Sequence, residues 1–213
     1  MRRASCRNHD PETGPAGSEA DSTPPSSGDA SLDALAEAVA ASDPDAFEIV
    51  FRRLSERIFR YVRGMTGSEA TAHDVTQDTF ARLWTHRRTL EEVDHLTSYV
   101  FQIARRRVYN LHRDRRVRRE NEGLLRDGEL SVAPDAPDAD VDTDLLQRQL
   151  DAWIDELPNR QREAITLSRM DGLSHEAIAR VMDISPNTVN AHIVKAMKHL
   201  RSRLREHRPD LLP

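Results

Sequence analysis

The sequence has almost no cysteine and no long apolar run. Cys6 is the single cysteine among 213 residues, which excludes an intramolecular disulfide framework and favours a reducing compartment, the cytoplasm. No segment approaches the roughly 18 consecutive apolar residues of a membrane-spanning helix. The basic start, residues 1–3, is followed by no apolar stretch, so we expect no secretory signal. These absences exclude integral membrane proteins and disulfide-stabilised secreted domains.

The formal net charge of −5 argues at first against a nucleic-acid-binding protein, but the charge is unevenly distributed. The net charge is −7 over residues 1–50, +8 over 51–119, −10 over 120–157 and +4 over 158–213. Two basic segments are therefore preceded and separated by acidic ones, a pattern that indicates contact with nucleic acid. Two helical domains with solvated arginine faces would give the same pattern, so charge alone leaves both interpretations open.

The residue pattern predicts an all-α protein of two small helical domains joined by a flexible acidic linker. Residues 1–30 are rich in Pro, Gly, Ser and Asp, and we expect a disordered tail because they bury too little apolar surface to offset their ordering entropy. Apolar residues at three- and four-residue steps fill residues 31–119 and 143–207, with no alternating strand pattern. The acidic, proline-bearing residues 120–142 are predicted to be the linker, and residues 208–213 a C-terminal tail.

Capping residues mark the helix starts in the first domain. Asp43 precedes Pro44, which predicts an N-cap followed by a proline at the first helical position. Gly64 and Gly67 are expected to end this helix, and Ser68 to cap the next one. The apolar face of the helix that begins at Pro44 is predicted to consist of Phe47, Val50, Phe51, Leu54, Ile58 and Val62. The two later helices are predicted to bury Ala72, Val75, Thr79, Phe80, Leu83 and Trp84, and Leu96, Val100, Ile103, Ala104, Val108 and Leu111.

Residues 173–205 carry the strongest local signal, that of a helix-turn-helix. Ser174 caps a short helix, residues 183–185 form a tight turn, and Ser185 caps a second helix with Pro186 at its first position. In DNA-binding proteins the N-terminal part of such a second helix enters the major groove and meets base edges. Asn there can bond adenine, and Lys or His can reach guanine or phosphate. The residues expected to face outwards are Asn187, Thr188, Asn190, Ala191, His192 and Lys195. A plain helical hairpin is the alternative.

Residues 105–119 hold eight arginines, with Tyr109 and Asn110 among them. Arginines spread around a helix can contact phosphates from several directions, and aromatic and amide groups beside them can stack on or bond to exposed bases. A solvated helix end is the alternative. An earlier predicted helix carries Asp74, Gln77 and Asp78, whose three- and four-residue spacing places them on one face. This face is suited to binding a basic partner, or it is simply exposed to solvent.

The sequence offers no complete catalytic or metal-binding motif. His175 and Glu176 begin like H-E-x-x-H, but position 179 is Ala, so the second zinc ligand is missing. Cys6 and His9 form at best half of a zinc site. We therefore expect no catalytic residue, no metal, no cofactor and no small-molecule substrate.

Two separate sets of motifs resemble bacterial RNA polymerase sigma factors of the sigma-70 family, in its ECF (extracytoplasmic function) group. Residues 72–80, AHDVTQDTF, resemble the signature A-E-D-[IV]-x-Q-[DE]-x-F, and residues 96–105, LTSYVFQIAR, resemble the W-L-x-x-I-A-R helix. Residues 157–162, 172–179 and 185–189 resemble L-P-x-x-x-R, G-x-S-x-x-E-I-A and S-x-x-T-V of region 4, although Glu176 lies one residue before the place of Glu in the second pattern and Ala177 occupies that place. The resemblance spans residues 44–207 and is weak only in the linker.

This resemblance implies a non-enzymatic subunit that binds core RNA polymerase and directs promoter recognition, promoter melting and transcription initiation. Residues 31–119 would be sigma region 2, and residues 143–207 sigma region 4. The residues implied to bind the polymerase are Asp74, Val75, Gln77, Asp78 and Phe80. Those implied to bind and melt the minus-ten element are Arg87, Arg88, His95, Tyr99, Arg105, Arg106, Tyr109, Asn110 and Arg113. Those implied to read the minus-thirty-five element are Ser185, Asn187, Thr188, Asn190, Ala191, His192 and Lys195.

The implied partners are core RNA polymerase, through its β′ clamp and β flap, promoter DNA and an anti-sigma factor. The free chain is expected to be a monomer, and its acidic linker to follow the basic RNA-exit path of the polymerase. Asn190 and His192 replace the usual Lys and Arg-like residues, which implies weaker phosphate contacts in region 4. A dimeric helix-turn-helix regulator that acts without polymerase is the alternative, but it would need a dimer seam or a ligand pocket, and the sequence shows neither.

Overall fold

The computed structural model describes residues 32–121, 141–169 and 171–207, which are helical and contain no strand. The N-terminal unit consists of α2 (Ala36–Ala40), α3 (Pro44–Thr66), α4 (Glu69–Thr85), the 3₁₀ helix η1 (Arg87–Glu92) and α5 (Leu96–Asn121). The C-terminal unit consists of α6 (Val141–Asp155), α7 (Asn159–Arg169), α8 (His175–Met182) and α9 (Pro186–His207). The prediction of an all-α protein with two helical domains is confirmed.

Some of the sequence predictions concern other parts of the chain. The N-terminal tail, the C-terminal tail, the Cys6–His9 pair and nearly all of the acidic linker lie outside the described residues. Helix α5 ends at Asn121 and α6 begins at Val141, so the helices flank the segment predicted to be the linker.

The starts of α3 and α4 follow the predicted caps. Oδ1 of Asp43 accepts hydrogen bonds from the backbone N–H groups of Asp45 and Ala46, at 2.9 and 3.3 Å. The hydroxyl oxygen of Ser68 accepts one from the backbone N–H of Thr71 at 3.2 Å. Each cap satisfies an N–H group that has no partner within its own helix, which stabilises the helix by about 1 kcal/mol.

The two glycines near the end of α3 have different roles. Gly67 is the C-cap, and its φ of 64° lies in the left-handed region that glycine adopts without steric cost. The prediction that Gly64 also ends the helix is wrong, because Gly64 lies inside α3. A Cβ atom at Gly64 would lie 3.4 Å from Cγ2 of Thr166 in α7. Gly64 therefore lies where α3 and α7 are in contact, and a Cβ atom there would make an ordinary van der Waals contact with Thr166.

The apolar face of α3 is largely as predicted. Val50, Leu54, Ile58 and Val62 have no exposed surface, and burying each such side chain stabilises the fold by about 1.5–3 kcal/mol. Phe51 is the exception, because 41% of its surface is exposed. The prediction that Phe51 faces the core is wrong.

The start of α5 is fixed by a residue far away in the sequence. Oδ1 of Asp33, which precedes α2, accepts a hydrogen bond from the backbone N–H of Leu96 at 2.7 Å. Its other carboxylate oxygen lies 3.5 Å from Nδ1 of His95. The chain before α3 therefore caps the helix that was predicted to recognise the minus-ten element.

The helix-turn-helix of the C-terminal unit forms as predicted. The hydroxyl oxygens of Ser174 and Ser185 accept hydrogen bonds from the backbone N–H groups three residues later, each at 3.2 Å. Between the two helices, Asp183 has a φ of 56° and ends α8 in the left-handed conformation. Val189 and Ile193 of α9 are buried, which turns the opposite side of α9 outwards.

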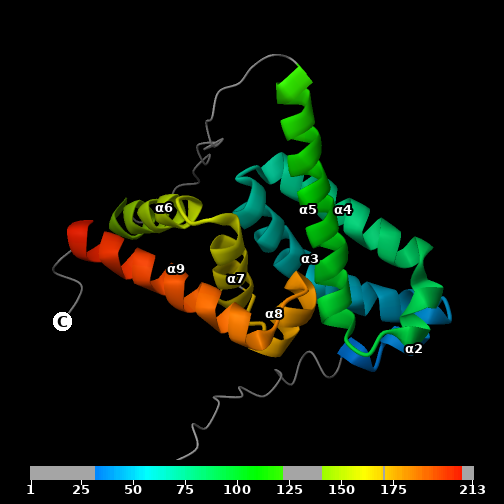
Figure 1. The fold of residues 1–213 in the computed structure, drawn as a ribbon. Coiled ribbons are helices and arrows are strands. Elements are labelled where there is room, and N and C mark those ends of the chain that lie inside the picture. Colours follow the sequence, from blue (N-terminus) through cyan, green and yellow to red (C-terminus); the bar gives the residue numbers. More distant parts are fainter. Residues whose placement is uncertain (1–31, 122–140, 170, 208–213) are drawn as a thin grey trace, which may run out of the picture.

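The two units pack against each other through α3 and α5 on one side and α7 and α8 on the other. Figure 1 shows α7 and α8 beside these helices near the centre of the molecule, whereas the C-terminal end of α5 projects away from it. The buried side chains of both units form one continuous apolar cluster. This packing determines which of the predicted site residues are accessible.

Candidate polymerase and nucleic-acid interfaces

Helix α4 presents part of the predicted polymerase-binding face. Asp74 and Gln77 are exposed. Asp78 is half-buried, and its Oδ2 atom accepts from Nε of Arg82 at 3.0 Å and lies 2.9 Å from Nε of Arg107 in α5. The exposed carboxylate and amide form a small polar face on which a basic partner can dock.

The two apolar members of that predicted set lie inside the molecule. Val75 is 2% exposed and Phe80 is 3% exposed. Neither side chain is positioned to touch a partner, so their contribution is to hold α4 against α3 and α5. Burial could not be read from the motif alone, because the motif mixes exposed and buried helix positions.

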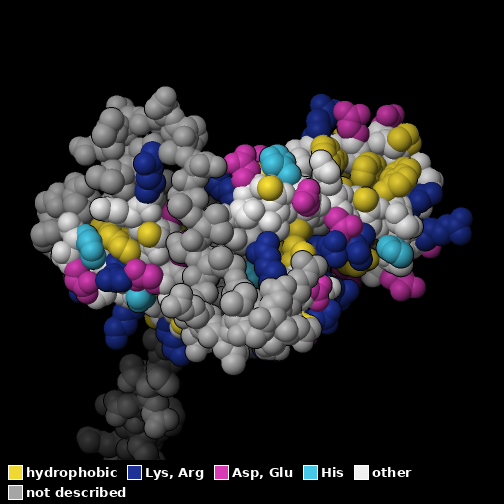
Figure 2. Space-filling view, turned by 90° about the horizontal axis from the view of Figure 1, so that it is seen from above, with side chains coloured by type: hydrophobic (Ala, Val, Ile, Leu, Met, Phe, Trp, Pro, Cys, Tyr) yellow, Lys and Arg dark blue, Asp and Glu magenta, His cyan; other side chains and the backbone are white. Residues whose placement is uncertain are grey.

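Apolar side chains on α3 form an exposed surface that the sequence did not reveal. Ile49 and Phe51 are 36% and 41% exposed. The Phe51 ring contacts the Phe80 ring at a centroid distance of 4.9 Å, and Phe47 contacts Trp84 at the same distance. Apolar side chains also gather on the N-terminal-unit side of the molecule in Figure 2. An exposed aromatic group continuous with the core is typical of a protein-binding surface.

The segment between α4 and α5 is partly the 3₁₀ helix η1. Nε of Arg87 donates to the hydroxyl of Ser42 at 2.7 Å, Nη1 donates to the carbonyl of Trp84 at 2.8 Å, and the guanidinium lies over the Trp84 ring at 4.6 Å. Arg88 and His95 are exposed. Arg87 thus holds the segment in place, Arg88 is available to a ligand, and His95 is exposed but lies beside Asp33.

Helix α5 divides its predicted DNA-binding residues into two groups. Arg106, Asn110 and Arg113 are exposed. Arg105 and Tyr109 instead face the C-terminal unit, where both bind one carboxylate. Tyr99 is half-buried, and its hydroxyl lies 3.2 Å from that of Thr89.

The carboxylate that binds Arg105 and Tyr109 belongs to Glu163 of α7. Nε of Arg105 donates to Oε1 at 2.7 Å, the hydroxyl of Tyr109 donates to Oε2 at 2.9 Å, and the hydroxyl of Tyr61 donates to Oε1 at 3.0 Å. The Glu163 side chain has no exposed surface. A single Glu in a short amphipathic helix gives no signal of such burial, so sequence reasoning missed it.

The same carboxylate shifts the pKa values of its partners. Burial raises the pKa of the Tyr61 hydroxyl well above its ordinary value, and the negative charge of Glu163 raises it further. Burial and Glu163 raise the pKa of Tyr109 in the same way. For Arg105, burial acts against the charged form, but the charge and hydrogen bond of Glu163 outweigh it and raise the pKa. Both hydroxyls therefore stay protonated and remain donors at neutral pH.

Asp171, which follows α7, is a second buried carboxylate of the C-terminal unit that lies against α3. Its side chain has no exposed surface and lies 3.8 Å from Nη2 of Arg60. Its backbone carbonyl accepts from Nη2 of Arg57 at 3.0 Å. Burial raises the pKa of the carboxyl from 3.8 to about 7, although Arg57 and Arg60 act in the opposite direction.

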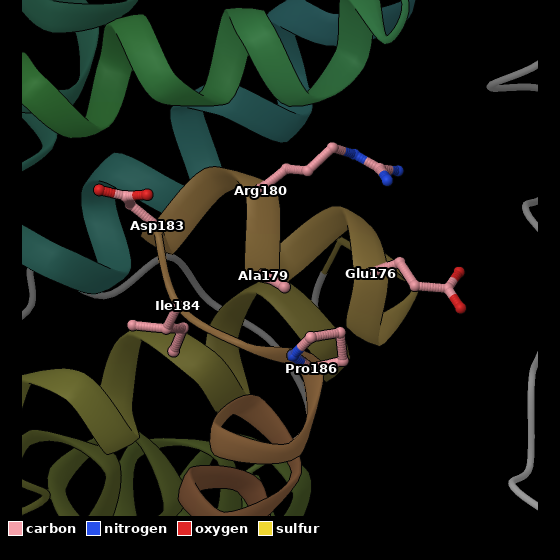
Figure 3. A pocket seen from close by; sticks show the side chains of 6 residues that line it. All are labelled: Glu176, Ala179, Arg180, Asp183, Ile184 and Pro186. Atoms are coloured by element: carbon pink, nitrogen blue, oxygen red, sulfur yellow. The ribbon is translucent and has the colours of Figure 1, made fainter.

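Helix α9 exposes most of the residues predicted to read DNA. Asn187, Thr188, Asn190, Ala191 and Lys195 are exposed, and His192 is half-buried. The hydroxyl of Ser185, also predicted to contact DNA, lies 2.8 Å from that of Thr188 as part of the cap. An open hollow of about 370 Å³ lies beside the start of α9 and is lined by Glu176, Ala179, Arg180, Asp183, Ile184 and Pro186. Figure 3 shows Glu176 and Arg180 pointing outwards from α8.

Within residues 32–121, 141–169 and 171–207, no group of three or more His, Cys, Asp or Glu side chains is placed to hold a metal ion. In the same residues no helix has the length and apolar character needed to cross a membrane.

Comparison with known proteins identifies both units. The family described as Sigma-70 region 2 matches residues 50–118, and the family described as Sigma-70, region 4 matches residues 147–200. The chain is 31% identical to the RNA polymerase sigma factor CarQ of Myxococcus xanthus over 164 residues, which are 76% of this chain and 91% of CarQ. It is 30% identical to the ferric citrate uptake sigma factor FecI of Escherichia coli over 128 residues, 60% of this chain and 73% of FecI. The ECF RNA polymerase sigma factor SigK of Mycolicibacterium vanbaalenii is 25% identical over 178 residues, 81% of this chain and 88% of SigK.

Solved structures share the fold. The sigma factor RpoE of Bartonella quintana, solved in complex with the anti-sigma factor NepR, matches with a TM-score of 0.61 and 21% identity, over 76% of this chain and 98% of RpoE. CnrH, solved with the cytosolic domain of CnrY, matches with a TM-score of 0.60 and 22% identity, over 82% of this chain and 97% of CnrH. The helix-turn-helix, the basic α5 helix and the two family matches in this order lead to one conclusion: the chain belongs to the sigma-70 family of RNA polymerase sigma factors, in its ECF group.

Proposed function

We propose that this sigma factor acts as a non-catalytic, dissociable subunit that attaches to core polymerase through α3 and α4 and to promoter DNA through η1, α5 and α9. One observation carries the proposal. Helix α9 holds Asn187, Thr188, Asn190 and Lys195 exposed on a helix-turn-helix, while Asp74 and Gln77 are exposed on a separate unit. A protein with two such surfaces can hold polymerase and DNA at the same time. Its place of action would be the cytoplasm, where bacterial polymerase works.

At the polymerase, the proposed contact combines the polar face of α4 with the apolar surface of α3. Asp74 and Gln77 offer acceptors to basic side chains of the β′ clamp, and Phe51 and Ile49 offer apolar area beside them. Apolar area supplies affinity, and the carboxylate supplies orientation and specificity. Val75 and Phe80 support this surface from within the core.

At the promoter, α9 would read the minus-thirty-five element from the major groove. Arg88, His95, Arg106, Asn110 and Arg113 would bind the minus-ten element. Melting requires no covalent chemistry, because the capture of flipped bases by the protein offsets a stacking loss of a few kcal/mol. Contact of the C-terminal unit with the β flap and regulation by an anti-sigma factor are also part of the proposal. The latter is supported by RpoE, which was solved with the anti-sigma factor NepR.

Reconstituted transcription tests the proposal. The purified chain should direct core RNA polymerase to initiate at a discrete promoter start. A chain that binds duplex DNA tightly by itself but never engages core polymerase would contradict it. That result would favour the alternative, a dimeric helix-turn-helix regulator, which the family matches do not favour.

The polymerase contact is tested by the double substitution Asp74→Ala with Gln77→Ala. Loss of the hydrogen bonds of a carboxylate and an amide should weaken binding to core polymerase by about tenfold. Fluorescence anisotropy of the labelled chain against core enzyme measures the dissociation constant. Glu91→Ala, at an exposed residue of η1, is the control and should leave core affinity unchanged. Equal affinity of the double variant and the wild type would remove α4 from the proposed contact.

A further inference from the structure

The 3₁₀ helix η1 has one side against the protein and one side towards solvent. Its inner side packs on α2 and buries Leu90, which is 1% exposed. Arg88, Thr89 and Glu91 remain exposed around it. Residues 32–43, which contain α2 and are here called the α2 segment, therefore support η1 from the side that faces away from solvent.

Arg87, the first residue of η1, anchors this end of the helix to the α2 segment. Its Nε atom donates to the hydroxyl oxygen of Ser42 at 2.7 Å, and its Nη1 atom donates to the carbonyl of Trp84 at 2.8 Å. The guanidinium also lies over the Trp84 ring, 4.6 Å from its centre. Hydrogen bonds from a charged donor are stronger than neutral ones. These contacts direct Arg87 towards its own protein rather than towards DNA, so its role is to position η1.

Ser42 makes this contact from a backbone conformation that serine rarely adopts. Its φ is 72°, in the left-handed region where a side chain causes steric strain and glycine does not. Its N–H donates to the carbonyl of Val39 at 2.9 Å, and the next N–H, that of Asp43, donates to the carbonyl of Ala38 at 3.0 Å. A glycine would end α2 here without strain, but it would lack the hydroxyl that binds Arg87. Strain that persists together with a specific contact indicates a function for that contact.

The α2 segment also holds the chain that follows η1. The carboxylate of Asp33 accepts a hydrogen bond from the backbone N–H of Leu96 at 2.7 Å, and its second oxygen lies 3.5 Å from Nδ1 of His95. Ser42 thus binds the first residue of η1, and Asp33 binds the chain where α5 begins. The exposed residues between these two anchors, Arg88 among them, are held from both ends by one short segment.

An ordered η1 matters because promoter melting has little free energy to spare. A segment that captures an unstacked base must offset the lost stacking of that base. If the segment were loose, binding would also have to offset the entropy lost on ordering its backbone and side chains. Anchors that order η1 before DNA arrives remove that second cost.

We infer that the α2 segment is a positioning element for promoter melting, in which Ser42, through Arg87, and Asp33, through the start of α5, hold η1 in the shape that receives an unstacked base of the minus-ten element. The inference rests on the proposed promoter role of η1. It concerns residues that the match to Sigma-70 region 2 does not cover, because that match begins at residue 50.

The test uses Ser42→Gly, which separates positioning from stability. The substitution removes the hydroxyl that anchors Arg87 and also relieves the backbone strain. The variant should therefore unfold at the wild-type temperature or above it, and its affinity for core polymerase should be unchanged. Holoenzyme with the variant should bind the single non-template strand of the minus-ten element about fivefold more weakly, as expected for one lost hydrogen bond. The probe is a fluorescein-labelled oligonucleotide taken from the promoter at which reconstituted transcription starts, and anisotropy gives the dissociation constant.

A series of oligonucleotides that each lack one base shows whether the effect is on base capture. With wild-type holoenzyme, affinity should fall most when the captured base is missing. With Ser42→Gly the loss at that same position should be smaller, because η1 no longer holds that base well. A merely structural role would weaken all oligonucleotides equally. Equal losses at every position in the variant and the wild type would overturn the inference.

Two further variants show whether the lost hydroxyl is the cause. In the part of the chain that the structure describes, Ser42 and Asp183 are the residues other than glycine with a positive φ. Asp183→Gly relieves the same kind of strain outside the α2 segment and η1, so it is the matched control and should show the wild-type pattern across the series. Ser42→Asn tolerates the left-handed conformation and supplies a side-chain acceptor, so it should restore much of the wild-type affinity. A base-specific defect in Asp183→Gly would overturn the inference.

Hydrogen exchange in the free chain separates this inference from the proposed function. The backbone amides of residues 88–93 should exchange faster in Ser42→Gly than in the wild type, and unchanged exchange would overturn the inference without any reference to polymerase. A wild-type chain that fails to direct initiation would overturn the proposed function, and with it the melting role, even if exchange shows that Ser42 orders η1.

Discussion

Replacement of Asp171 by Asn probes the energetics of the interface between the two units. Neither carboxylate oxygen of Asp171 has a hydrogen-bond partner in the described part of the chain, and the side chain is fully buried. Burial raises its pKa from 3.8 to about 7, against the opposing influence of Arg57 and Arg60 on α3. The native state therefore retains a proton that the unfolded chain releases at lower pH.

The sign of the effect follows from this difference. Below about pH 4 both states are protonated, and Asp171 imposes no pH-dependent cost. As the pH rises from about 4 to about 7 the native state loses stability relative to the unfolded state, and above that the cost is constant. A pKa difference of roughly three units corresponds to about 4 kcal/mol. This is an upper limit, because separation of the two units also brings the carboxylate to water.

Asp171→Asn removes the buried charge and keeps the shape. Its free energy of unfolding should exceed that of the wild type by up to about 4 kcal/mol at pH 8, and the two should converge near pH 4. Urea unfolding followed by fluorescence measures this, since Trp84 lies in the N-terminal unit and Trp153 in the C-terminal unit.

Asp183→Asn, at an exposed residue of the same unit, is the control and should show no pH-dependent gain. A variant less stable than the wild type at pH 8 would refute the reasoning. It would mean that the attraction of the Asp171 carboxylate to Arg57 and Arg60 exceeds the cost of its burial.

Two further predictions concern the DNA-binding helices. Asp33→Ala should lower the free energy of unfolding by about 1 kcal/mol and speed hydrogen exchange at the Leu96 amide, because it removes the cap of α5. Asp33→Asn keeps an acceptor and should retain most of the cap. Equal exchange rates at Leu96 in the two variants would show that the cap contributes nothing. Lys195→Ala should reduce the slope of log affinity against log salt for holoenzyme binding to promoter DNA by about one unit if Lys195 contacts a phosphate, and an unchanged slope would exclude that contact.

The helices could be predicted from the sequence because helix caps and the spacing of apolar residues depend on residues that are close together in the chain. Asp43, Ser68, Ser174 and Ser185 each bond to the backbone two or three residues away, so their roles can be read from neighbouring letters. The three- and four-residue spacing of apolar residues likewise revealed the buried side of α3, apart from Phe51. Phe51 differs because its exposure depends on the position of the neighbouring helix α4. The spacing of apolar residues within α3 does not specify that position.

The motifs also gave the family and most of the candidate site, since they order chemical groups along the chain. They could not tell which members are accessible. Val75 and Phe80 share a motif with Asp74 and Gln77 but are buried, because the helix turns them towards the core. Arg105 and Tyr109 share α5 with Arg106, yet they face the other unit.

The sequence by itself determined two helical units, their caps and membership in the sigma-70 family. Only the tertiary structure decided that the buried carboxylate of Glu163 meets Arg105, 58 residues away along the chain, and that Asp171 is buried against α3. The physical reason is that burial and pairing depend on which distant helix faces are brought together. The distribution of charge along the chain indicates what kind of partner each segment attracts. The packing of α7 and α8 on α3 and α5 determines which charged side chains are accessible to that partner.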